Sequence, residues 1–230
     1  MILKKREFLG MENLPDEPFV SVGNHCQMYG PLIMEIYFPT KKHIWCTSEM
    51  MTLKEVPAYA YKEFWSNKPK ILRPLFKLLS YIIAPIAAYL FNSADALPVY
   101  HDRRIIKTME STVEGLINGE NAVIFPERHE RYNNILCDFQ TGFVDVARLY
   151  YAKTKRPLAF VPTYNAVMLK KVLFGTPIYF DPKAPVKQER ERICAYLKEE
   201  ITRLALTLPP HKVVPYENLA RKDFPISKEG

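Results

Sequence analysis

The stretch Phe19-Val20-Ser21-Val22-Gly23-Asn24-His25 decides the fold class of this chain. Its first four residues are short, apolar and rich in β-formers, and Gly23 ends the run, which predicts a buried strand. Asn24 and His25 follow directly, at the carboxyl end of that strand. We therefore expect the functional site at the ends of the strands.

Further strands and helices alternate along the rest of the chain, which indicates an α/β protein. The pattern predicts a single domain with a central mixed, mostly parallel sheet flanked by helices. Residues 172–174 and 178–180 are expected to form a hairpin around Gly175-Thr176-Pro177. The other predicted strands are 19–22, 43–47, 96–100, 122–125 and 158–161, and the predicted helices are 31–37, 105–117, 142–151 and 187–206.

The length of 230 residues suits one domain that buries its own core. Within the domain 1–230 we expect an N-terminal extension over 1–17 and a surface-bound C-terminal tail over 208–230. The four cysteines are scattered, without CxxC pairs, which predicts reduced thiols in the cytosol. The N-terminus has no continuous apolar run, so it resembles neither a secretory signal nor a membrane anchor.

The chain is basic, with a formal net charge of +7, and this charge favours an anionic partner. An anionic membrane or a phosphorylated substrate fits this charge as well as nucleic acid does. Lys and Arg are spread along the sequence without a nucleic-acid motif, and we expect no nucleic-acid partner. The spacing of His101, His129 and Cys137 matches no zinc pattern, and we expect no metal.

The most apolar segment is 75–91, LFKLLSYIIAPIAAYLF. It is slightly shorter than the roughly 20 apolar residues of a spanning helix, which favours a buried core helix over a transmembrane one. Basic residues at 68, 70, 73 and 77 precede or enter it, which is typical of a segment lying at a membrane interface. The sequence leaves the buried and the interfacial interpretations open.

Four sequence blocks, taken in order, resemble those of the glycerophospholipid acyltransferases, a family that includes the 1-acyl-glycerol-3-phosphate acyltransferases. The resemblance covers about 19–162. The blocks are Asn24-His25 after the first strand, Leu97-Pro98-Val99 followed by Arg103-Arg104, Phe125-Pro126-Glu127, and Phe160-Val161-Pro162, with Gly142 before the intervening helix.

The resemblance implies that His25 is the catalytic base of an O-acyltransferase. An imidazole suits this role because its pKa lies near neutrality. The family carries an Asp five residues after the His, where this chain has Gly30. Losing the orienting carboxylate costs about ten-thousand-fold in the serine-protease template, so weak activity or a substitute group is expected. Candidate substitutes are Glu35, Asp102, Glu127, Glu130, Gln27 and Tyr29.

The resemblance also implies residues that bind the substrate: Asn24, Arg103, Arg104, Glu127, Arg128 and Arg131. Arginine suits phosphate because its planar guanidinium donates two parallel hydrogen bonds. Each of these residues also has a structural interpretation, namely an exposed surface cation for the arginines and a cap or ion pair for Glu127. His25 itself can be a hydrogen-bonded turn histidine. Cys26 is excluded as its nucleophilic partner, because neighbours on an extended chain point to opposite sides.

The expected function is transfer of a fatty acyl group from acyl-CoA or acyl-carrier protein to the hydroxyl of a lysophospholipid. No cofactor is implied beyond this acyl thioester co-substrate. The expected location is cytoplasmic, at the inner face of the cell membrane. Two alternatives remain: a non-catalytic lipid- or acyl-binding relative, and an acyltransferase for a non-glycerolipid acceptor.

Overall fold

A computed structural model describes residues 5–65, 69–94, 96–128 and 132–227. The chain divides into two compact units, residues 1–42 with 109–230, and residues 43–108. We call them the sheet unit and the inserted unit; the second boundary falls within helix α4. This division into compact units does not test the expectation of a single domain, which stays a prediction.

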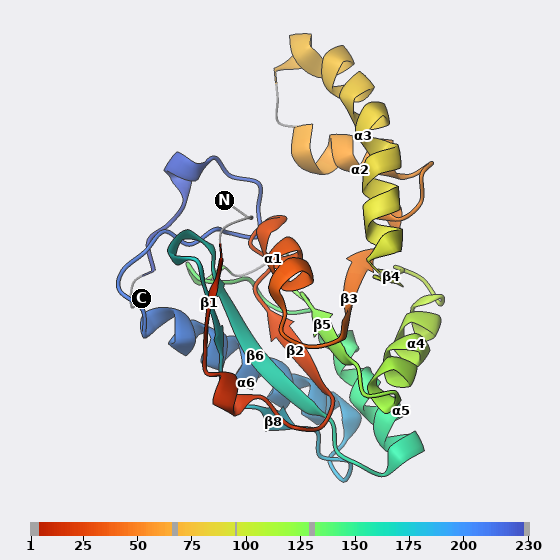
Figure 1. The fold of residues 1–230 in the computed structure, drawn as a ribbon, viewed down its shortest axis with the longest axis vertical. Coiled ribbons are helices and arrows are strands. Elements are labelled where there is room, and N and C mark those ends of the chain that lie inside the picture. The colour runs from red at the N-terminus through yellow and green to blue at the C-terminus, as the bar shows by residue number, and fades with distance from the viewer. Residues whose placement is uncertain (1–4, 66–68, 95, 129–131, 228–230) are drawn as a thin grey trace. The chain divides into compact units, whose positions relative to one another are not determined.

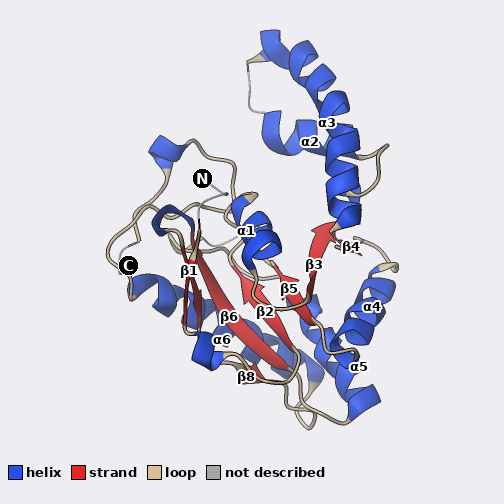
Figure 2. Ribbon diagram, in the orientation of Figure 1, coloured by secondary structure: helices blue, strands red, loops and turns tan. Residues whose placement is uncertain are grey.

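The sheet unit is built on a mixed, mostly parallel sheet with the strand order β1-β7-β6-β2-β5 (Figures 1 and 2). β2 lies in the middle, parallel to β6 on one side and to β5 on the other. The predicted fold class is therefore confirmed. The strands are β1 (Glu7–Leu9), β2 (Phe19–Gly23), β5 (Asn121–Ile124), β6 (Ala159–Ala166), β7 (Lys171–Phe174) and β8 (Ile178–Tyr179).

Helices cover both faces of this sheet. In Figure 1, α1 lies in front of it and α6 lies behind it. The apolar spacing of α6 explains its place, because Ile193, Leu197 and Ile201 recur on one side of the helix and are fully buried. The helices are α1 (Tyr29–Tyr37), α4 (Ile105–Ile117), α5 (Asp145–Thr154) and α6 (Val186–Leu206).

The expected hairpin between β7 and β8 is wrong. Both strands pair antiparallel with β6, β7 along Thr163 to Ala166 and β8 along Ala159 and Phe160. The backbone N–H of Gly175 donates to the carbonyl of Pro162, which keeps the chain running along β6 instead of turning back. The two apolar runs predicted the strands but not the strand with which they pair, because pairing is decided by long-range contacts.

Two peripheral segments are part of the packed structure. Within the expected N-terminal extension, β1 adds a parallel edge strand to β7. The tail after α6 buries His211, Val213, Val214 and Phe224, each less than 9 % exposed. These side chains hold the tail in place, whereas residues 217–223 are exposed, so the expectation of a surface-bound tail stays a prediction.

The inserted unit holds the parallel pair β3 (Lys42–Thr47) and β4 (Leu97–Val99), with α2 (Val56–Ala60) and α3 (Arg73–Ser93) between them. α2 packs on α3 through a small core that includes Val56, Ala60, Ala84 and Ala88. Most of α3 remains exposed, including Tyr81 at 68 % and Ile86 at 58 %. The interpretation of 75–91 as a buried core helix is therefore wrong.

Candidate active site

The candidate site lies at the carboxyl ends of three adjacent strands. The register pairs Val22 of β2 with Ile124 of β5, and Gly23 with Thr163 of β6. The residues that follow these positions, His25 and Glu127 among them, therefore leave the sheet at the same level. Ligands of open α/β sheets bind outside this end of the strands.

Asn24 joins the end of β2 to β6. It is only 1 % exposed, and its Oδ1 accepts a hydrogen bond of 2.7 Å from the backbone N–H of Asn165. Its Nδ2 donates to the sulfur of Cys26 at 2.9 Å. These contacts give the side chain a structural role; substrate binding by Asn24 stays a prediction.

The two residues after His25 form a left-handed turn. Cys26 has φ 51° and Gln27 has φ 56°, a conformation that side-chain-bearing residues adopt rarely and at an energetic cost. Behind the turn, the N–H of Tyr29 donates to the carbonyl of Cys26 at 3.0 Å, and that of Gly30 donates to the carbonyl of His25 at 3.1 Å. The turn thus folds the start of α1 back against His25.

This packing explains why position 30 carries no carboxylate. A Cβ atom on Gly30 would lie 2.4 Å from the carbonyl oxygen of His25 and 2.8 Å from that of Asn24. Both atoms are backbone and cannot move aside as a flexible side chain would. With this turn, no side chain fits at position 30, so a carboxylate cannot approach His25 from there.

Two aromatic rings contact the imidazole of His25. Phe125 contacts it edge-on at 5.5 Å between ring centroids, and Tyr216 does so at 5.3 Å. The residue is partly exposed, yet its Nδ1 is buried and has no hydrogen-bond partner within the described ranges. Burial lowers the pKa of His25 to about 4, although a backbone hydrogen bond at Gln27 acts in the opposite direction. The ring is therefore neutral at pH 7.

Glu127 holds the backbone of His25. The side chain is 3 % exposed, and its two carboxylate oxygens accept hydrogen bonds from the N–H of His25 at 2.5 Å and from that of Cys137 at 2.8 Å. Burial raises the pKa of Glu127 to about 7, although the two N–H donors act in the opposite direction. These contacts make Glu127 a residue that positions the backbone of His25. Binding of substrate by Glu127 stays a prediction.

Three of the other expected substitutes for the missing Asp, namely Glu35, Asp102 and Gln27, have different partners. Glu35 forms an ion pair with Lys42 at 3.2 Å, and Asp102 forms one with Arg104 at 2.8 Å. Gln27 donates its amide to backbone carbonyls at the C-terminal end of the chain. Glu130 lies outside the described residues. No group in the described part of the chain therefore hydrogen-bonds Nδ1 of His25.

The expected phosphate-binding arginines are not gathered beside His25 by any described contact. Arg103 and Arg104 belong to the inserted unit, where the guanidinium of Arg104 lies 4.3 Å from the ring centroid of Tyr100. Arg128 is exposed just after Glu127, and its N–H donates to the carbonyl of Asp138. Arg131 lies outside the described residues. Phosphate binding by these arginines stays a prediction.

Two residues of the site, Asn165 and Tyr216, were not predicted from the sequence. Asn165 is a polar residue in a buried strand that also contains Thr163, and polar side chains at such positions are the available hint, because buried polar groups need partners. Tyr216 stands in a tail without periodicity, and nothing in the sequence connects it with His25. Both contacts join segments far apart along the chain.

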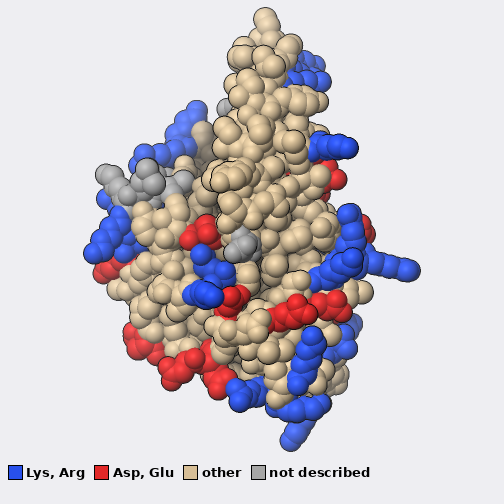
Figure 3. Space-filling model, turned by 45° about the vertical axis from the view of Figure 1, so that its right-hand side comes forward, with Lys and Arg blue, Asp and Glu red and all other residues tan. Residues whose placement is uncertain are grey.

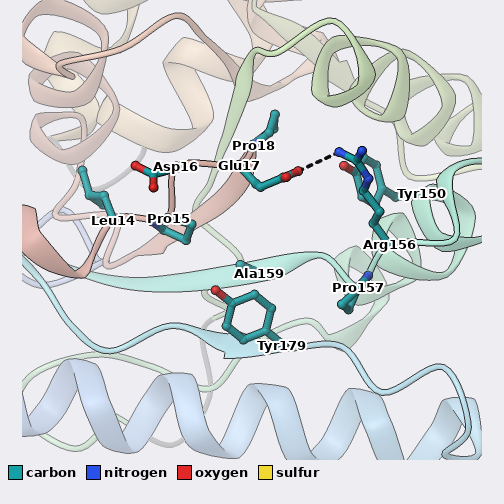
Figure 4. A pocket seen from close by; sticks show the side chains of 10 residues that line it. All are labelled: Leu14, Pro15, Asp16, Glu17, Pro18, Tyr150, Arg156, Pro157, Ala159 and Tyr179. Carbon is teal, nitrogen blue, oxygen red and sulfur yellow. Dashed lines mark hydrogen bonds and ion pairs between the residues drawn. The ribbon is translucent and has the colours of Figure 1, made fainter.

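A separate cleft of about 500 Å³ opens at the other end of the strands (Figure 4). Pro18 before β2 and Ala159 at the start of β6 line it, together with Tyr150 and Tyr179. Arg156 crosses its rim to pair with Glu17 at 3.0 Å. Because it lies at the amino ends of β2 and β6, the cleft is not part of the His25 site.

The described residues contain no group of three or more His, Cys, Asp or Glu side chains that could hold a metal ion. They contain one helix, Lys70–Ser93, that is long and apolar enough to cross a membrane; its most apolar 18 residues have a mean hydropathy of 1.6, and 17 % of them are buried.

No family model and no curated protein matches the chain. Among solved structures, the chain is similar to the 1-acyl-sn-glycerophosphate (LPA) acyltransferase PlsC from Thermotoga maritima. The TM-score is 0.47 at 16 % sequence identity, over 88 % of this chain and 73 % of that one. A likeness of this degree does not identify an activity.

Proposed function

We propose that this protein is an O-acyltransferase that moves a fatty acyl group from acyl-CoA or acyl-carrier protein to the hydroxyl of a lysophospholipid. One observation carries the proposal: a neutral imidazole stands at the carboxyl ends of three strands, with its backbone held by Glu127. The order of the four sequence blocks supports the same reaction. The acceptor class comes from the resemblance of those blocks.

In the proposed reaction His25 takes the proton from the acceptor hydroxyl while its oxygen attacks the thioester carbonyl. The new C–O bond replaces the C–S bond, and the imidazolium returns its proton to the leaving thiolate. Burial disfavours the imidazolium, and no carboxylate at Nδ1 within the described ranges offsets this. We therefore expect slow turnover compared with enzymes that carry the His-Asp pair.

The proposed place of reaction is the inner face of the cell membrane. α3 exposes large apolar side chains, among them Leu78, Ile82 and Tyr89. The sequence contains no Asp or Glu between Glu63 and Asp95. In Figure 3 the surface at the top of the view, where α3 lies, carries few charged side chains, with basic ones at its edge. Such a surface suits an interface with anionic lipid.

The test is to incubate the purified chain with acyl-CoA or acyl-carrier protein and lysophosphatidic acid, and to measure free thiol and product lipid. We expect slow product formation that His25→Ala abolishes and that His101→Ala, a change at an exposed histidine of the inserted unit, leaves intact. Equal product from the His25→Ala and unaltered proteins would exclude His25 as the base.

A second candidate function is supported by the same site. A fold that excludes a side chain at Gly30 and leaves Nδ1 of His25 without a described partner also suits a non-catalytic lipid- or acyl-binding protein. The observation to make is binding of a fluorescent acyl chain without turnover of any acceptor in a panel. Including amine and sugar acceptors tests transfer to a non-glycerolipid. This alternative stays open because Arg128-His129-Glu130-Arg131 follow Glu127 here, where the family that the blocks resemble has Gly-Thr-Arg-Ser.

A further inference from the structure

The C-terminal segment closes on itself beside the candidate site. The backbone N–H of Val213 donates to the carbonyl of Pro225 at 2.8 Å, and that of Ser227 donates to the carbonyl of His211 at 2.8 Å. We call the residues between these pairs, 214–224, the C-terminal loop. A loop of this length with joined ends is a compact Ω-loop, a type that frequently serves function.

The base of the C-terminal loop is fixed to the core of the sheet unit. His211 is 5 % exposed, and its Nε2 shares a hydrogen bond of 2.8 Å with the hydroxyl of the fully buried Tyr164 on β6. The hydroxyl of Ser227 lies 3.0 Å from Nδ1 of the same ring. Because these bonds are buried, they hold the ends of the loop at a defined place on β6.

The start of the C-terminal loop reaches His25. The ring of Tyr216 lies edge-on to the imidazole, with 5.3 Å between centroids and an angle of 82° between planes. The Nε2 of Gln27 donates to the carbonyls of Glu217 at 2.9 Å and of Leu219 at 3.2 Å. The left-handed turn after His25 therefore carries both the imidazole and a side chain that holds the loop against it.

Tyr216 and Phe125 are the aromatic side chains in contact with the imidazole of His25. An imidazole with an acid at Nδ1 is oriented by that hydrogen bond. Here Nδ1 has no described partner and Gly30 admits no side chain, while two aromatic rings contact the imidazole at 73° and 82°. Edge-to-face contacts of this kind are a preferred arrangement of aromatic rings and so favour one orientation of the imidazole.

We propose that Tyr216 is a positioning residue for His25, carried by the C-terminal loop and held in place by the amide of Gln27. The orientation of the imidazole then depends on the aromatic contacts with Phe125 and Tyr216, beside the backbone hydrogen bond at Gln27. What His25 does for catalysis rests on the function proposed above, but the contact between Tyr216 and His25 exists whether or not the chain transfers acyl groups.

Three variants and a control separate this role from general stability. Tyr216→Phe keeps the ring and Tyr216→Ala removes it. Gln27→Asn retains a residue that tolerates φ 56° but shortens the amide by one methylene, so that it no longer reaches the loop. Tyr179→Ala, at the other end of the sheet where the side chain is 51 % exposed, is the matched control.

The first readout is the NMR titration of the His25 ring in the full chain, with Glu127 unchanged in every variant. We expect the pKa of His25 to stay low in the unaltered, Tyr216→Phe and Tyr179→Ala proteins. The pKa of His25 should rise by at least one pH unit in Tyr216→Ala, because water then reaches the ring. In Gln27→Asn it should rise by less. A folded Tyr216→Ala protein whose His25 titrates like that of the unaltered protein would overturn the proposal.

The second readout is modification of His25 by diethyl pyrocarbonate, followed by peptide mass spectrometry. We expect about tenfold faster modification of His25 in Tyr216→Ala and a smaller increase in Gln27→Asn, with no change in Tyr216→Phe. If Tyr216→Ala does not fold, Gln27→Asn decides, and its unchanged modification rate would count against the proposal. Neither readout needs acyl transfer, so an inactive chain refutes the proposed function without touching this inference.

Discussion

At the scale of single residues, Gly30 and Glu127 determine what His25 can do. Gly30 lets the first turn of α1 pack on the carbonyls of Asn24 and His25. Glu127 joins the N–H of His25 to that of Cys137 and thereby fixes the end of β2. The site is thus built around the backbone of His25, while its imidazole contacts Phe125, Tyr216 and the backbone of Gln27.

Replacing Gly30 should destabilise the protein without restoring a dyad. Gly30→Ala places a methyl group 2.4 Å from a backbone oxygen, and we expect a loss of roughly 1–3 kcal/mol in the free energy of unfolding, as for overpacked cores. Gly142→Ala is the control, since a Cβ there meets nothing within 4 Å; its effect should stay within about 0.5 kcal/mol. Urea denaturation measures both. Equal stability of the two variants would contradict the packing described for Gly30.

Glu127 should make stability depend on pH. Its pKa is about 7 when folded and 4.5 ordinarily, so the folded state binds this proton more tightly. The stabilising contribution is complete below pH 4.5 and is lost as the pH rises through 7. A pKa difference of this size corresponds to the order of 3 kcal/mol. Glu127→Gln, measured by urea denaturation between pH 5 and 8, should lack this component.

His25 should act in the opposite direction. Its pKa is about 4 when folded and 6.5 ordinarily, so the contribution is complete above pH 6.5 and is lost as the pH falls through 4. His25→Ala should therefore weaken the acid side of the stability profile, whereas Glu127→Gln changes the neutral side. Identical profiles for the two variants would contradict the burial of one of these groups.

At the scale of elements, packing within the inserted unit does not account for the exposed apolar side chains of α3. Its small residues pack on α2, while most of its large residues remain exposed. A helix that hides its alanines and exposes Ile, Leu and Tyr has the reverse of the usual pattern for a helix in water. The exposed face fits a lipid interface, and this assignment can be tested residue by residue.

Polar substitutions on α3 should weaken binding to lipid vesicles. Ile82→Ser and Ile86→Ser each remove a side chain that is more than half exposed, and burial of such a side chain is worth about 1.5–3 kcal/mol. Vesicle sedimentation should show at least about tenfold weaker binding for each. Ile117→Ser, at a 48 % exposed position on α4, is the matched control and should bind normally. Equally weakened vesicle binding in all three variants would show that α3 has no specific role in binding lipid.

At the scale of the whole molecule, the net charge of +7 should set the salt dependence of membrane binding. Each Lys or Arg near an anionic surface contributes about 1 kcal/mol, and screening reduces this beyond a Debye length of about 10 Å at 0.1 M salt. Binding to vesicles with anionic lipid should therefore weaken as salt rises, and binding to zwitterionic vesicles should be weaker and less affected. Binding independent of lipid charge would contradict the electrostatic part of the proposal.

The sequence by itself determined the elements and the place of the site. A short run rich in β-formers that Gly23 ends predicted β2, and the spacing of Ile193, Leu197 and Ile201 predicted α6, because both patterns are local. It also placed His25 and Glu127 after their strands, where the register of a parallel sheet brings such positions together.

Only the tertiary structure decided what surrounds His25. The pairing of β7 and β8 with β6, the carbonyls against Gly30, and the approach of Tyr216 depend on contacts between distant segments. The hydrogen bond from Gln27 to Glu217, for example, joins residues 190 positions apart. No periodicity encodes such a contact, because it arises from packing of the finished sheet against the C-terminal loop.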